Sequence, residues 1–162
     1  MDRVDKIIAQ WNEERPDLDV APMALVGRFK LITQHLAREM DKTFAAHGLT
    51  HASFDVLATL RRSGPPYGLS PGDLLASTMV TSGTMTNRID QLEKVNLVER
   101  IRNPDDGRSV IISLTDSGFT AVNAALAAHM ETQARLTSDL SEKDSTTLKK
   151  LLSKFLKGLE EN

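Results

Sequence analysis

Apolar residues recur at helical spacing over most of the chain. The first stripe falls in residues 2–14 and consists of Val4, Ile7, Ile8 and Trp11. A second, longer stripe predicts a helix that begins near Pro22 and ends before Gly48. Two more stripes follow Thr115 and Ser141, which are both suited to cap a helix. The chain therefore begins and ends with long amphipathic helices.

The predicted elements between these ends are shorter. Thr50 can cap a helix whose inner face carries Phe54, Leu57 and Leu60. The stretch 63–68 is rich in glycine and proline and ends that helix. Ser70 then caps a short helix, and about three residues separate this helix from another over 81–95. Two short helices joined in this way are typical of a helix-turn-helix.

β-branched residues dominate the next segment and predict a hairpin with strands over 97–102 and 109–114. Its turn carries Gly107, where we expect a positive φ, and Arg108 near the tip. A helix-turn-helix followed by such a hairpin is the layout of a winged helix. We predict a mainly α fold with a small β-hairpin: a winged helix-turn-helix DNA-binding region over 50–114, flanked by dimerisation helices over 1–47 and 115–162, in a single domain.

The terminal helices carry more apolar surface than one small core can bury. Surplus stripes of this kind usually pack against a second copy of the chain. Because two-fold symmetry is the commonest arrangement of oligomers, we expect a homodimer.

Composition narrows the class of protein. The chain of 162 residues has no cysteine, which excludes disulfides, thiolate nucleophiles and cysteine-based zinc sites. The four histidines are not spaced as a metal site, and no phosphate loop or nucleophile elbow occurs, so we expect neither a cofactor nor an enzyme. No apolar run reaches the roughly 20 residues of a membrane span, and the N-terminus lacks a signal-peptide core. These features predict a cytoplasmic protein without a membrane partner.

The formal net charge of −2 gives no excess of basic residues of the kind that many DNA-binding proteins show. A few side chains at specific positions would therefore have to bind double-stranded DNA. Small polar residues crowd the start of the helix over 81–95, the end that enters the major groove in helix-turn-helix proteins. Arg108 can enter a narrow minor groove, where Asp105 or Asp106 could hold it by an ion pair. The candidate DNA contacts are Ser70, Thr81, Ser82, Thr84, Asn87 and Arg108. A winged-helix module that binds protein instead of DNA is the alternative.

Three sequence runs resemble the MarR family of bacterial transcriptional regulators. They are Leu97-Val-Glu-Arg100, Asp105-Asp-Gly-Arg108 and Leu114-Thr-Asp-Ser-Gly118. The resemblance follows the order of elements over residues 22–160. It implies a homodimeric repressor that binds palindromic sites beside promoters. Small anionic or aromatic ligands would release this repressor from the DNA.

A narrower resemblance points to the urate-responsive members of that family. It rests on the extra N-terminal helix and on the runs 54–63 and 87–90. It implies that Trp11, Asp55, Arg88 and Arg100 surround an anionic effector such as urate or a related purine.

The chemistry of these four residues suits a planar anion. Two arginines can neutralise the charge, and Trp11 offers a flat face. Asp55 could pair with Arg88 while the site is empty. Each residue also has a structural alternative: Trp11 could pack in its helix stripe, Asp55 could complement a helix dipole, Arg88 could contact DNA, and Arg100 could be a surface charge on its strand.

Overall fold

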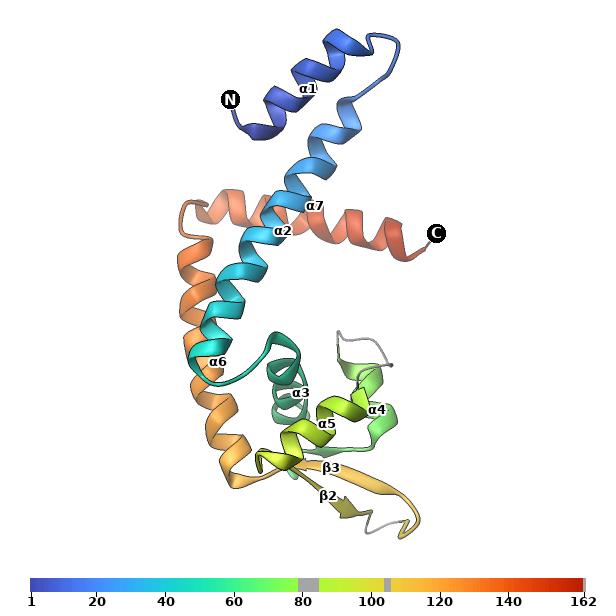
Figure 1. Cartoon of the computed structure of the whole chain (residues 1–162), viewed down its shortest axis with the longest axis vertical. Helices are drawn as coiled ribbons and strands as arrows, with labels where there is room; N and C mark the ends of the chain where they lie inside the picture. The colour runs from blue at the N-terminus through green and yellow to red at the C-terminus, as the bar shows by residue number, and fades with distance from the viewer. Residues whose placement is uncertain (79–84, 104–105, 162) are drawn as a thin grey trace.

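The computed structural model describes residues 1–78, 85–103 and 106–161. Its elements are α1 (Arg3–Glu14), α2 (Ala21–Ala46), α3 (His51–Arg62), β1 (Gly68–Leu69), α4 (Pro71–Ser77), α5 (Met85–Lys94), β2 (Val98–Arg102), β3 (Val110–Leu114), α6 (Asp116–Leu136) and α7 (Glu142–Glu160). The predicted fold class, mainly α with a small β-sheet in a winged helix-turn-helix arrangement, is confirmed. Figure 1 shows α2 and α6 leading from α1 and α7 at one end to a compact unit of α3, α4, α5 and the sheet at the other.

Side-chain caps start four of the helices where the sequence predicts them. Each hydroxyl accepts the backbone N–H three residues ahead, at 2.9 to 3.1 Å. The capping residues are Thr50, Ser70, Thr115 and Ser141. These bonds satisfy N–H groups that have no partner within the helix.

The sheet has three antiparallel strands in the order β1-β3-β2. β2 and β3 form the predicted hairpin, with Val98 opposite Leu114 and Arg102 opposite Val110. β1 was not predicted, because two residues are too short to show an alternating pattern. The expected positive φ at Gly107 is wrong, because the described glycines with a left-handed φ are Gly48 and Gly64.

The hydrophobic core lies within the compact unit and extends to the ends of α2 and α6 that contact it. α5 buries Met85, Ile89 and Leu92, the inward face that its spacing predicts. These residues join one apolar cluster with side chains from α2, α3, α4, α6 and the sheet, including Phe44, Leu57, Leu74, Ile112 and Val122. The cluster fixes α5 and the base of the hairpin against α3.

The other end of the molecule leaves much apolar surface uncovered. α7 has no buried residue, and α1 buries only Val4. Leu126 and Met130 of α6 are 37% and 47% exposed. Among the described helices, no segment combines the length and apolar character needed to cross a membrane.

Candidate DNA and effector sites

α5 presents a polar face to solvent, and we call it the reading helix. Asn87 and Gln91 are exposed on it, and the Gln91 amide donates to Asn87 Oδ1 at 3.4 Å. The predicted contacts Thr81, Ser82 and Thr84 lie outside the described residues. Asn87 is therefore the one predicted contact on this helix whose surroundings can be described.

Ser70 lies at the start of α4, the first helix of the helix-turn-helix. Its Oγ accepts the Asp73 backbone N–H at 3.1 Å and donates to Asp73 Oδ2 at 2.7 Å. This hydroxyl therefore serves as a helix cap in the structure.

The hairpin of β2 and β3, which we call the wing, projects from the compact unit (Figure 1). Arg108 is exposed near its tip. Asp106 Oδ1 accepts the backbone N–H of Arg108 at 3.1 Å, and not its guanidinium, while Asp105 lies outside the described residues. Asp106 thus shapes the turn and leaves the Arg108 side chain to project.

Arg100 lies on β2 and binds two carboxylates of the reading helix. Its Nη2 donates to Asp90 and its Nη1 to Glu93. The hydrogen bond to Asp90 is the main cause that raises the pKa of Arg100. Neither acid is predicted from the sequence, because the pairs span a turn and follow no periodic spacing.

Arg88 and Asp55 lie on α5 and α3, which pack against each other. Both residues are half-buried. Arg88 Nη1 is buried and has no hydrogen-bond partner among the described residues. Any pairing of Arg88 with Asp55 therefore does not use this atom. A buried, unsatisfied guanidinium N–H is unusual, and it is a natural partner for an anion.

Trp11 lies on α1 and is 42% exposed. Figure 1 places α1 at the opposite end of α2 from α3 and α5. Within one chain, the structure therefore does not bring Trp11 to Asp55, Arg88 or Arg100.

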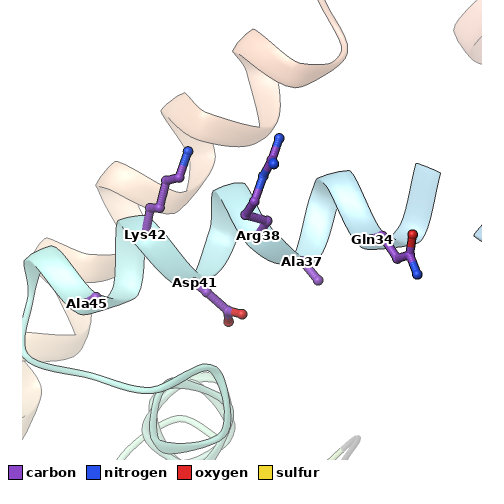
Figure 2. A pocket seen from close by; sticks show the side chains of 6 residues that line it. All are labelled: Gln34, Ala37, Arg38, Asp41, Lys42 and Ala45. Atoms are coloured by element: carbon purple, nitrogen blue, oxygen red, sulfur yellow. The ribbon is translucent and has the colours of Figure 1, made fainter. Parts of the chain in front are cut away.

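Several hollows lie along the long helices α1, α2, α6 and α7. One between α1 and α2 is mainly apolar, with walls that include Val4, Ile7, Met23, Val26 and Leu31. Figure 2 shows a second, shallow one along α2, lined by Gln34, Ala37, Arg38, Asp41, Lys42 and Ala45. None of the predicted site residues lines either hollow.

Arg61 is a further residue that no pattern in the sequence singles out. Its guanidinium lies over the rings of Tyr67 and Phe119, 5.1 and 4.6 Å from their centroids, and Nε donates to Asn123 Oδ1 at 3.0 Å. These contacts join α3 to the start of α6. They link the compact unit to the long helices.

A helix-turn-helix with a projecting wing is typical of DNA-binding transcriptional regulators, and the similarity to known proteins places the chain in that class. Residues 49–110 match the model of the MarR family. The HTH-type transcriptional regulator PecS of Dickeya dadantii (strain 3937) is 40% identical over 159 residues, which are 98% of this chain and 96% of PecS. The chain belongs to the MarR family, whose members here are transcriptional regulators rather than enzymes.

Solved structures show the same fold. A mutant of MarR from E. coli, complexed with operator DNA, is similar with a TM-score of 0.72 and 26% identity, over 90% of this chain and 97% of that one. Sco3205 from Streptomyces coelicolor, also in complex with DNA, has a TM-score of 0.77 at 20% identity, over 88% and 89% of the two chains.

Proposed function

We propose that this regulator is a homodimeric repressor that binds palindromic operator DNA. A small planar anion, such as urate or a related purine, would release the repressor from this DNA. Cytoplasmic localisation is part of the proposal. The observation that carries the effector part is the buried, unpartnered Nη1 of Arg88 on the reading helix, which has no hydrogen-bond partner among the described residues.

For DNA binding, Asn87 and the start of the reading helix would enter the major groove. Arg108 at the wing tip would enter the minor groove. Thr81, Ser82 and Thr84 belong to the proposed groove contacts. Ser70 would approach a phosphate at the start of α4. The relatives solved with DNA support this arrangement, since their fold matches this chain.

For dimerisation, residues 1–47 and 115–162 would supply the interface. The support is the apolar face of α7, which stays exposed in the single chain and includes Leu151, Leu156 and Leu159 at 56% to 61% exposure. An exposed apolar face on a terminal helix marks a surface that another protein surface covers. Leu156→Glu should convert a dimer to a monomer in sedimentation analysis, and a monomeric wild type would contradict the interface.

For the effector, Arg88 would bind the anionic group from the reading helix and Asp55 would face it from α3. Because Arg100 already binds Asp90 and Glu93, an anion that reaches Arg100 must compete with those carboxylates. Trp11 would stack on the planar ring only if dimer formation brings α1 to the site. Binding that moves the reading helix would weaken DNA affinity by the same factor by which DNA weakens effector binding.

Direct calorimetric titration with urate tests the effector site without DNA. Wild type should bind, Arg88→Ala should bind at least about tenfold more weakly because a charge-assisted hydrogen bond is lost, and Lys30→Ala, which lies on α2, should bind as wild type does. Equal binding by wild type and Arg88→Ala would remove Arg88 from the site. Xanthine and small aromatic carboxylates in the same assay identify the class of anion.

A further inference from the structure

Apolar packing fixes only the base of the wing. In β2, Val98 is buried and the four residues after it are exposed. In β3, Ile112 is fully buried, whereas Val110 near the tip is 39% exposed. Burial thus ends halfway along the hairpin, so packing alone leaves the direction of its outer half weakly determined.

Arg100 stands at the point where this packing ends. Side chains alternate along a strand, so Arg100 lies on the same face of β2 as the buried Val98, one step further toward the tip. Asp90 and Glu93 are three residues apart on the reading helix and share one of its faces. The planar guanidinium uses a different nitrogen for each carboxylate, which fixes both its orientation and its distance from the reading helix.

We propose that Arg100 is a positioning residue for operator binding: together with Asp90 and Glu93 it forms a clamp that sets the angle between the reading helix and the wing. The clamp lets α5 and Arg108 reach the major and minor grooves at the same time. It rests on the proposed DNA contacts of α5 and Arg108, but it requires no effector. Exposed ion pairs contribute little to global stability, so opening the clamp should alter DNA binding while the fold persists.

A direct contact between Arg100 and a DNA phosphate would behave differently. Loss of a phosphate contact reduces the dependence of affinity on salt concentration by about one unit of slope. Removing the two acids would then favour DNA, because they repel phosphates. If Arg100 acts as a clamp instead, removing the two acids weakens DNA binding although the protein becomes less negative.

Fluorescence anisotropy with duplex DNA from upstream of the gene for this chain, at several salt concentrations, separates these cases. Arg100→Gln should weaken binding roughly three- to tenfold, and Asp90→Asn/Glu93→Gln by a similar factor, with the wild-type salt slope. The triple variant should bind no worse than Arg100→Gln. Unchanged or tighter binding by Asp90→Asn/Glu93→Gln, or a reduced slope for Arg100→Gln, would overturn the clamp.

Two further variants complete the test. Arg135→Gln removes another ion pair between elements, that of Arg135 with Glu39 (3.2 Å). Once sedimentation shows that this variant has the wild-type oligomeric state, it should bind DNA as wild type does. Arg108→Ala should weaken binding in the wild-type background and less so in the Arg100→Gln background. If Arg108→Ala has no effect on wild type, the wing contact fails and the clamp fails with it. If Arg108→Ala weakens binding but the acid variant does not, only the clamp fails.

Discussion

Gly118 sets the junction between the wing and the long helix α6. A Cβ at this position would lie 1.9 Å from the carbonyl oxygen of Leu97. Thr115 strengthens the same contact, because its backbone N–H donates to Leu97 O at 3.3 Å and its Oγ1 donates to Asn96 O at 2.7 Å. The start of α6 therefore touches the turn between α5 and β2 directly through backbone atoms.

Gly118→Ala should lower the free energy of unfolding by about 2 kcal/mol or more, because backbone must move to admit the methyl group. Urea denaturation measures the change. Gly72→Ala is the matched control, since its Cβ would have Ser70 Oγ as its nearest neighbour at 3.8 Å. Equal stability of the two variants would show that the Gly118 contact is looser than described.

His129 is a buried imidazole on α6, packed between aromatic rings. Its centroid lies 5.0 Å from that of Phe44 and 5.2 Å from that of Phe54. Burial lowers the pKa of His129, and the nearby His51 lowers it further. The folded chain therefore holds this group neutral at a pH where the unfolded chain has begun to protonate it.

This shift predicts a loss of stability in mild acid. Because the pKa is lower in the folded state, the contribution of His129 is complete above the unfolded value of about 6.5 and declines as pH falls toward the folded value. Denaturation between about pH 7.5 and 5, the range that spans this value, should show a shallower decline for His129→Gln than for wild type. Equal slopes for His129→Gln and wild type would contradict the assignment.

At the scale of elements, the sequence predicted the helices and the hairpin well, because capping residues and apolar stripes are local signals. It missed β1, whose two residues depend on their partners Ser113 and Ile112 in β3. It missed the pairing of Arg100 with Asp90 and Glu93 for the same reason: a contact between elements leaves no periodic trace. The apolar stripes of the terminal helices also do not reveal whether the same chain or a second copy covers them.

The packing of α1 on α2 combines one apolar and one charged contact. Val4 is buried against α2, where a Cβ on Gly27 would lie 3.2 Å from its Cγ1. Arg28 binds both acids of the α1 capping box, with Nε 2.9 Å from Asp2 Oδ2 and Nη2 on Asp5. Backbone hydrogen bonds within the box are the main cause that lowers the pKa of both carboxyls, and Arg28 lowers them further.

Arg28→Ala should therefore loosen α1 while the compact unit stays intact. Hydrogen–deuterium exchange should show faster exchange of the α1 amides and unchanged exchange in α3 and α5. Arg15→Ala, which breaks only the ion pair with Asp17 between α1 and α2, is the control. Unchanged protection of α1 in Arg28→Ala would mean that Val4 alone keeps the helix in place.

At the scale of the whole molecule, the winged helix-turn-helix and the exposed apolar surface lie at opposite ends of the chain. α3, α4, α5 and the wing lie at one end of α2 and α6, and α1 and α7 at the other (Figure 1). Two copies joined through the apolar end would present two reading units related by a two-fold axis, which matches the symmetry of a palindrome. In such a dimer the exposed face of α7 would join the two copies, and both wings would contact the same duplex.

The most direct test of this account is the occupancy of upstream operator DNA, followed by fluorescence anisotropy as urate is added. Binding should saturate at two chains per duplex, and the DNA should be released over the urate concentrations at which calorimetry shows binding. Arg88→Ala complexes should resist release. A protein that binds urate but keeps its operator occupied, or that does not bind the DNA at low salt, would contradict it.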